Sequence, residues 1–336
     1  MIAQAAGAML LACAAAAAPP DGSGPAEKQA ALRAELKKLP WRVVYESCRE
    51  GNWDLHVMNA DGTGGVNLTH TAKVDEMYPH ASPDGRRISF VADEGAGRER
   101  VRSVHVMSAD GRERKLVARN ARQPCWGPDS RRLLYARSEY ERFTLSSYAT
   151  KELVFCDLAA DRHRPHLDER LLHVTYLCWS PCGRWVFGTV EGGMGFGHAN
   201  LAIEAEGTAV HRLTQVGGCR MDFRPDGRGL LWNATDQDLV VADLDLAAGA
   251  PKVGTPRTVV SCAKPDKVYH GDFSPDGRFI LFSHGPQGQQ HVGMLAPGWH
   301  IYVAAAAETN VWVRLTSDGE GNKEPDWLPA AKEQGT

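Results

Sequence analysis

The sequence lacks an excess of charge of either sign, since its 336 residues include 38 Lys and Arg against 41 Asp and Glu, a formal net charge of −3. Nucleic-acid-binding proteins usually carry a basic excess that neutralises phosphates, so we do not expect nucleic acid as a partner. The sequence also lacks any Cys-x-x-Cys pair among its eight cysteines. This absence argues against a cysteine-ligated zinc site and against a dithiol redox site.

Long hydrophobic runs are missing too, except at the amino terminus. Residues 1–18 are uncharged and alanine-rich, and they end at a Pro-Pro pair. This composition predicts a signal peptide cleaved after Ala18 and export to the periplasm or cell envelope, with a buried core helix as the alternative. The stretch from Leu10 to Cys13 resembles a bacterial lipobox, so Cys13 is a candidate lipid anchor. No later run is long enough to span a bilayer, which predicts a mature chain without a transmembrane span.

Residues 19–40 are predicted to form a linker with one short helix. Pro25 suits the first turn of a helix and Pro40 stops one, which indicates a helix over residues 25–39. Its apolar face would consist of Leu32, Leu36 and Leu39. We expect this helix to pack on the rim of the main domain.

The rest of the chain is a repeat built around one proline. An aromatic residue stands two positions before this proline in five of six copies, and the copies are 44 to 54 residues apart. They are Pro83, Pro128, Pro181, Pro225, Pro275 and Pro329. A repeat of roughly 40–50 residues is typical of the four-stranded blades of β-propellers.

Each period also contains the elements of one blade. In Pro83-Asp84-Gly85 the proline presets φ, the aspartate bonds locally to the backbone and the glycine tolerates positive φ, which predicts a tight turn. A β-rich run follows at residues 87–91, then an alternating run at 104–107 and a fourth run at 115–117. Together with the run before the proline, one period predicts four antiparallel strands.

The two ends of the repeat complete one another. Residues 41–45, 55–58 and 66–69 supply second, third and fourth strands, whereas residues 324–328 supply a first strand with nothing after it. Together they predict one blade shared between the termini, so that the ring closes without an open edge. The predicted fold is all-β, a six-bladed β-propeller of four-stranded antiparallel blades over residues 41–329, followed by a tail at 330–336.

These segments resemble the TolB-like β-propeller family, whose WD40-like repeat has an aromatic residue, Ser-Pro-Asp-Gly, a hydrophobic strand, an Asp-Gly turn and a strand ending in Leu-Thr. Phe273 to Gly277 matches the first part and Arg212 to Thr214 matches the last. The resemblance covers residues 41–329. It implies a noncatalytic role in which the propeller binds a protein or polysaccharide of the cell envelope. The repeat also occurs in peptidases and carbohydrate lyases, so the alternative is a carbohydrate-active lyase or hydrolase.

Candidate ligand-binding residues occupy the predicted starts of the six first strands. Because these strands are expected to run toward the Pro-Asp-Gly turns, their starts should form a channel mouth on the opposite face, and propellers usually bind ligands at such a mouth. The candidates are Tyr78, Gln123, Tyr176, Arg220, His270 and Glu324, with His80 at a neighbouring position.

Two interpretations of this mouth remain open. His80, His270 and Glu324 could converge as acid/base groups or as ligands of a divalent metal. Alternatively the mouth is simply solvated, and an aspartate that recurs at one position in three blades bonds backbone groups between blades. These aspartates are Asp222, Asp272 and Asp326. Their recurrence favours a structural role, so we predict ligand-binding residues with no catalytic residue, no metal and no cofactor.

Overall fold

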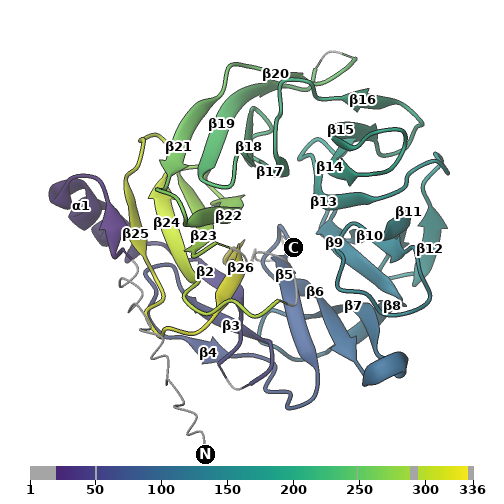
Figure 1. Ribbon diagram of the computed structural model, residues 1–336, viewed down its shortest axis with the longest axis horizontal. Helices are drawn as coiled ribbons and strands as arrows, with labels where there is room; N and C mark the ends of the chain where they lie inside the picture. The colour runs from purple at the N-terminus through teal and green to yellow at the C-terminus, as the bar shows by residue number, and fades with distance from the viewer. Residues whose placement is uncertain (1–19, 50, 248, 288–293, 332–336) are drawn as a thin grey trace, which may run out of the picture.

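The computed structural model describes residues 20–49, 51–247, 249–287 and 294–331, and it forms a ring of six β-sheets (Figure 1). The sheets are arranged radially as blades, and the first strand of each blade lies nearest the centre. This arrangement confirms the predicted all-β, six-bladed propeller. The predicted signal peptide, Cys13 and residues 332–336 lie outside the described residues.

The strands of each blade are as follows, from the centre outward. Blade 1 consists of β26 (Asn322–Leu328), β2 (Arg42–Ser47), β3 (Asp54–Asn59) and β4 (Val66–Asn67). Blade 2 consists of β5 (Asp75–Ala81), β6 (Arg87–Glu94), β7 (Val101–Ser108) and β8 (Lys115–Arg119), with a short 3-10 helix η1 (Gly97–Glu99) between β6 and β7. Blade 3 consists of β9 (Ala121–Trp126), β10 (Arg132–Ser138), β11 (Thr150–Asp157) and β12 (Arg162–Pro165).

The other three blades follow the same plan. Blade 4 consists of β13 (Val174–Trp179), β14 (Trp185–Glu191), β15 (His198–Glu204) and β16 (Val210–Arg212). Blade 5 consists of β17 (Cys219–Phe223), β18 (Gly229–Asn233), β19 (Asp238–Asp245), β20 (Lys252–Val253) and β21 (Arg257–Ser261). Blade 6 consists of β22 (Lys267–Phe273), β23 (Phe279–Gly285), β24 (His300–Ala305), β25 (Trp312–Arg314) and β1 (Gly22–Ser23).

Blade 1 joins the two ends of the propeller, as predicted. Strand β26 runs antiparallel to β2, with Trp327 opposite Val43 and Leu328 opposite Arg42. Trp327 and Val43 are both buried, so apolar packing as well as the backbone ladder holds the ring closed.

Three local features go beyond the prediction. Strand β1 pairs with β25 and adds a fifth strand to the outer edge of blade 6, and in blade 5 both β20 and β21 pair with β19. Helix α1 (Ala26–Leu36) ends three residues before the predicted end, because Lys38 and Leu39 bond to carbonyls three residues back. Leu32 and Leu36 are buried in the cluster between blades 6 and 1, which puts the helix on the rim as expected.

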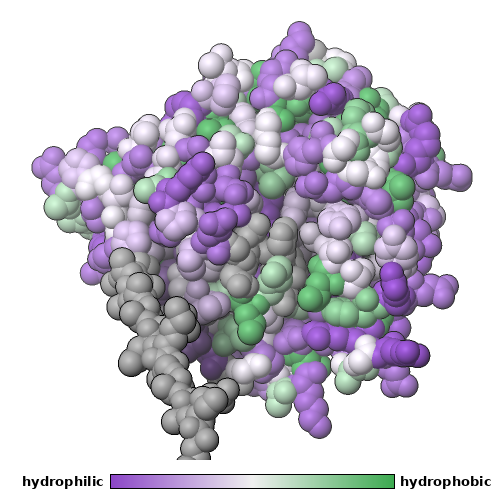
Figure 2. All heavy atoms as spheres, viewed as in Figure 1, coloured by the Kyte–Doolittle hydropathy of each residue, from purple (hydrophilic) through white to green (hydrophobic). Residues whose placement is uncertain are grey.

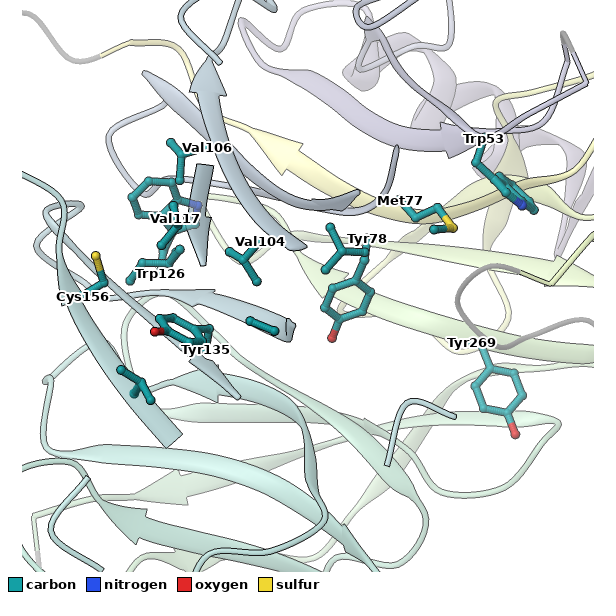
Figure 3. Close-up of a cluster of buried hydrophobic side chains, with 14 of the residues drawn as sticks. Trp53, Met77, Tyr78, Val104, Val106, Val117, Trp126, Tyr135, Cys156 and Tyr269 are labelled. Atoms are coloured by element: carbon teal, nitrogen blue, oxygen red, sulfur yellow. The ribbon is translucent and has the colours of Figure 1, made fainter. Parts of the chain in front are cut away.

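The apolar core lies mainly between neighbouring blades. Phe155 of blade 3 packs on Trp179 of blade 4 with ring centroids 5.3 Å apart, and Phe187 of blade 4 packs on Phe223 of blade 5 at 4.6 Å. The cluster drawn in Figure 3 instead reaches the centre of the ring, because it includes the first-strand residue Tyr78. The centre is therefore partly filled by side chains.

The outer surface is predominantly polar. Figure 2 shows one face, on which hydrophilic side chains cover most of the rim and hydrophobic ones form small scattered groups. Exposed large hydrophobic residues occur in the loop between β10 and β11 and in the segment before β24; they are Tyr140, Leu145, Tyr148, Met294 and Leu295. Among the described residues, α1 included, no helix has the length and apolar character that crossing a membrane requires.

The glycine of the first Pro-Asp-Gly turn is expected to matter more than its counterpart in blade 5. Gly85 and Gly227 have nearly equal φ angles of 70° and 71°, but a Cβ on Gly85 would collide with the Pro329 carbonyl oxygen, whereas one on Gly227 meets nothing within 4 Å. Gly227→Ala should cost about 1–2 kcal/mol for the left-handed backbone, and Gly85→Ala should cost a further ~1–3 kcal/mol for overpacking. Urea unfolding of the two variants checks this; equal destabilisation would contradict it.

Candidate functional site

Six buried side chains form one layer inside the central channel. They are the predicted site residues Tyr78, Gln123, Tyr176, Arg220, His270 and Glu324, which are 3% to 8% exposed and have φ between 46° and 59°. Each occupies the same place in its first strand, where the pairing with the second strand shifts register in all six blades. A left-handed residue at a β-bulge re-aims its side chain. We call these six residues the plug.

The plug lies at a different height in the channel from the predicted one. The first strands begin one to three residues before the plug residue: β17 begins at Cys219, one residue before Arg220, and β5 begins at Asp75, three residues before Tyr78. The strand residues before the plug position were not predicted, because a β-bulge interrupts the alternation of inward and outward side chains by which a strand is recognised in a sequence. The candidates therefore lie within the channel and not at a mouth opposite the turns.

One half of the plug is neutral and hydrogen-bonded. The hydroxyl of Tyr78 donates to Gln123 Oε1 at 3.1 Å, and the backbone N–H of Tyr176 donates to the same oxygen at 2.8 Å. The backbone N–H of Tyr78 donates to Glu46 Oε2 at 2.8 Å. These bonds connect blades 1 to 4 across the centre of the ring.

The other half of the plug is an ionic cluster. Arg220 Nη1 donates to both carboxylate oxygens of Glu324, at 3.0 and 3.2 Å, and His270 Nε2 lies 3.1 Å from Glu324 Oε1. The Arg220 guanidinium also stacks 4.1 Å from the centroid of the Tyr176 ring, a favourable cation–π geometry. Two of the three candidate acid/base residues, His270 and Glu324, are thus paired with each other.

The electrostatics of this cluster favour a fixed charge pair. Burial alone would raise the pKa of Glu324, but Arg220 and then His270 outweigh it and hold the pKa well below its ordinary value. Burial lowers the pKa of His270 to about 4, although Glu324 opposes the shift. At neutral pH, Glu324 and Arg220 therefore form a buried ion pair, and His270 lies beside Glu324.

A second buried pair lies beside the plug and was missed by the sequence analysis. Lys323 and Glu46 are both fully buried, with Lys323 Nζ 3.5 Å from Glu46 Oε1 and 4.7 Å from the Trp53 ring centroid. Burial raises the pKa of Glu46 to about 7, against the attraction of Lys323. Both residues fall outside the repeated positions; the available signal was the charged residue Lys323 directly before the predicted first strand at 324–328.

A second layer follows the plug on the side of the Pro-Asp-Gly turns. It consists of the aligned residues His80, Cys125, Cys178, Asp222, Asp272 and Asp326. The Asp222 carboxylate accepts from the Phe273 backbone N–H at 2.8 Å, and that of Asp272 accepts from the Trp327 N–H at 3.0 Å. The recurring aspartates thus bond the backbone of the next blade, as the structural interpretation predicted.

His80 belongs to this second layer and is not part of the ionic cluster of the plug. Its Nδ1 lies 2.9 Å from Asp326 Oδ2, while His270 pairs with Glu324. His80, His270 and Glu324 therefore do not converge on one point, as the acid/base or metal interpretation required, but form two separate pairs with different partners. Their role in ligand binding stays a prediction.

Burial and neighbouring carboxyl groups raise the pKa values of Asp222 and Asp272. Burial and then the nearby Asp326 charge raise the pKa of Asp222 to about 7. Burial, followed by the charges of Asp326 and Asp222, raises the pKa of Asp272 well above its ordinary value. Because like charges in one site disfavour joint ionisation, the charge on Asp326 opposes the ionisation of Asp222 and Asp272.

The Asp272→Asn variant should therefore become more stable than the wild type as the pH rises. The raised pKa means that the folded wild type holds a proton that the unfolded chain releases, so its stability falls from about pH 4 upward. Asparagine cannot ionise and keeps an oxygen for the Trp327 amide. Because Asp272 is only half-buried, we expect a gain of about 1 kcal/mol at pH 8 that disappears near pH 4.

Urea unfolding at the two pH values measures this difference. The matched control is Asp161→Asn, because Asp161 is an exposed surface residue paired with Lys115. A pH-independent effect of Asp272→Asn would contradict the prediction.

A hollow opens from the plug toward the Pro-Asp-Gly turns. An inner cavity of about 220 Å³ is lined by plug residues, and an outer cavity of about 530 Å³ is lined by all six turn prolines. The two share Trp126, Trp179, Asp272 and Asp326 in their walls. We call the combined hollow the funnel. It lies on the face of the Pro-Asp-Gly turns, opposite the predicted mouth.

Aromatic side chains dominate the walls of the outer cavity. They are Trp41, Trp126, Trp179, Phe273 and Trp327. Four of them, Trp126, Trp179, Phe273 and Trp327, stand two residues before a turn proline, and this common position was the signal that they share one face; Trp41 gave no such signal. In the part of the chain that the structure describes, no group of three or more His, Cys, Asp or Glu residues is arranged to hold a metal ion.

Comparisons with known proteins bear on the fold. No family model matches the sequence, and no curated protein matches it. Among solved structures, TolB from Acinetobacter baumannii superposes with a TM-score of 0.62 over 90% of this chain and 71% of that one, at 16% identity. The chain has a TolB-like β-propeller fold.

Other propellers superpose on this TolB-like propeller as well. A chain of the nidogen/laminin complex gives a TM-score of 0.58 at 10% identity and covers 86% of this chain and 98% of that one. Oligogalacturonate lyase in complex with manganese gives a TM-score of 0.50 at 14% identity, covering 81% and 73%. At such identities the likeness concerns the fold alone, and one fold serves several functions.

Proposed function

We propose that this TolB-like propeller is an exported, noncatalytic binding module of the cell envelope, which holds a partner protein at the funnel. The observation that carries the proposal is the contrast between the two layers. The ionisable side chains of the plug pair with one another and are buried, whereas the outer part of the funnel is a cavity of about 530 Å³ bordered by aromatic side chains and the turn prolines. Buried paired charges serve structure, and an open aromatic hollow suits recognition.

The cellular location belongs to the same proposal. The composition of residues 1–18 supports export, and the TolB-like fold of the ring is compatible with a role in the cell envelope. Lipidation of Cys13 would tether the propeller to a membrane surface.

A second candidate function rests on one specific observation. His80 pairs with Asp326 through Nδ1, and its Nε2 has no hydrogen-bond partner among the described residues. A histidine oriented by a carboxylate is the usual arrangement of a general base. Because His80 lines the inner cavity, a carbohydrate-active lyase or hydrolase with His80 as its base is the alternative.

Site-specific photo-crosslinking tests the proposed function. A photoreactive amino acid in place of Trp41, which lines the funnel, should crosslink a protein from envelope extract. The same amino acid in place of Tyr140, 45% exposed in the loop between β10 and β11 on the opposite face, should not. Crosslinking from Tyr140 alone would overturn the proposal. Polysaccharide cleavage that is lost in His80→Ala would support the enzyme instead.

A further inference from the structure

We propose that the funnel receives a lysine or arginine side chain from an extended segment of the partner protein. The cationic group would lie between the carboxyl groups of Asp272 and Asp326 and the indole rings of the wall. This inference rests on the proposed function, because it names the chemistry that the same funnel would recognise.

The first argument is that the second layer contains three carboxyl groups and a single histidine. Blades 5, 6 and 1 are consecutive in the ring and contribute Asp222, Asp272 and Asp326. The carboxylates of Asp222 and Asp272 accept the backbone N–H groups of Phe273 and Trp327, and His80 Nδ1 lies 2.9 Å from Asp326 Oδ2. Three carboxyl groups in one half-buried layer repel one another, so a cation entering from the funnel would be attracted by all three.

The second argument is the aromatic wall above these carboxyl groups. Cationic groups bind favourably over indole faces, with tryptophan the best of the aromatic residues. Two of the wall rings already take part in this interaction, since Arg87 lies 5.1 Å from the Trp126 centroid and Arg132 lies 5.1 Å from the Trp179 centroid. A long side chain would pack its methylene groups against the wall while its charged end reaches the carboxyl layer.

The size of the hollow selects a side chain and not a folded element. The outer cavity of about 530 Å³ narrows to an inner cavity of about 220 Å³ that ends at the plug. Pockets of roughly 300–1,000 Å³ are typical of sites for small groups. An anionic ligand is disfavoured here, because the carboxyl groups at the base of the funnel would repel it.

Binding of capped pentapeptides Gly-Gly-X-Gly-Gly, with X lysine, arginine, norleucine or glutamate, tests this inference. Titration calorimetry at low salt should give at least tenfold tighter binding for lysine and arginine than for norleucine, and none for glutamate. The Asp272→Asn, Asp326→Asn double variant should lose at least tenfold of the lysine-peptide affinity, while Asp161→Asn on the surface should keep it. Thermal unfolding verifies that the variants are folded.

Several other outcomes of these titrations would overturn the inference. Equal binding of the lysine and norleucine peptides, or full binding by the double variant, would overturn the inference. The crosslink from the Trp41 position would then still decide the proposed function separately. Lysine-peptide binding that appears only when the chain is shortened to end at Ala331 would assign the cation to this chain's own Lys332, and would overturn the assignment to a partner. Preferential binding of neutral oligosaccharides over the lysine peptide would overturn it as well.

Discussion

A chain that ends at Glu320 is expected to lose the cooperative fold of the propeller. This truncation removes β26, which is the innermost strand of blade 1 and pairs along β2. It leaves β2 with an unpaired edge facing the channel, and it also removes Lys323, Glu324 and Trp327 from the buried centre. The loss of the near-ultraviolet circular dichroism signal and of a sharp thermal transition would measure the effect.

A synthetic peptide of residues 321–331 provides the control. Added in excess, it should restore the thermal transition of the truncated chain, because it supplies the missing strand in trans. The same peptide with Trp327→Ala should restore less, since Trp327 is 3% exposed and lies opposite Val43. A truncated chain with the melting temperature of the full chain would show that closure by β26 is not needed.

Removing the Glu324 carboxylate is expected to be the most damaging single substitution in the channel. Glu324→Ala leaves the Arg220 guanidinium buried without its paired charge, and breaking a buried ion pair typically costs about 3–5 kcal/mol. Urea unfolding at pH 7 measures the loss. Glu324→Gln should be milder, because the amide oxygen can still accept from Arg220.

The double variant Arg220→Met, Glu324→Gln separates charge imbalance from loss of packing. It should recover much of the stability lost in Glu324→Ala, since no unpaired charge is left. As a surface comparison, Lys28→Ala removes a half-exposed pair with Glu308 and should cost about 1 kcal/mol or less. If Glu324→Ala were as mild as Lys28→Ala, the plug would not act as a buried ion pair.

Much of the fold was predictable because the repeat encodes it locally. The turn at Pro83-Asp84-Gly85 depends on the backbone preferences of three adjacent residues, and such preferences do not require knowledge of the rest of the chain. The pairing of β26 with β2 was predictable since only one complete blade can be assembled from the two ends. The added strands β1 and β20 were not, because two-residue strands carry no periodic signal.

The candidate site was predictable in its membership and not in its position. Alignment on the turn proline brought Tyr78, Arg220 and Glu324 together as equivalent residues, and the structure puts them in one layer. Their left-handed backbone at a bulge moves them from the predicted mouth to the interior. A bulge depends on the register between two strands, and one sequence of alternating residues is compatible with more than one register.

By itself the sequence determined that this protein is a closed ring of six four-stranded blades, because turn chemistry and strand periodicity are local and are repeated six times. Only the tertiary structure decided which charges meet across the ring. Arg220 and Glu324 are 104 residues apart, and His80 and Asp326 are 246 apart. Their pairing, the buried plug and the opening of the funnel toward the turns follow from the curvature of the whole ring, which no single repeat contains.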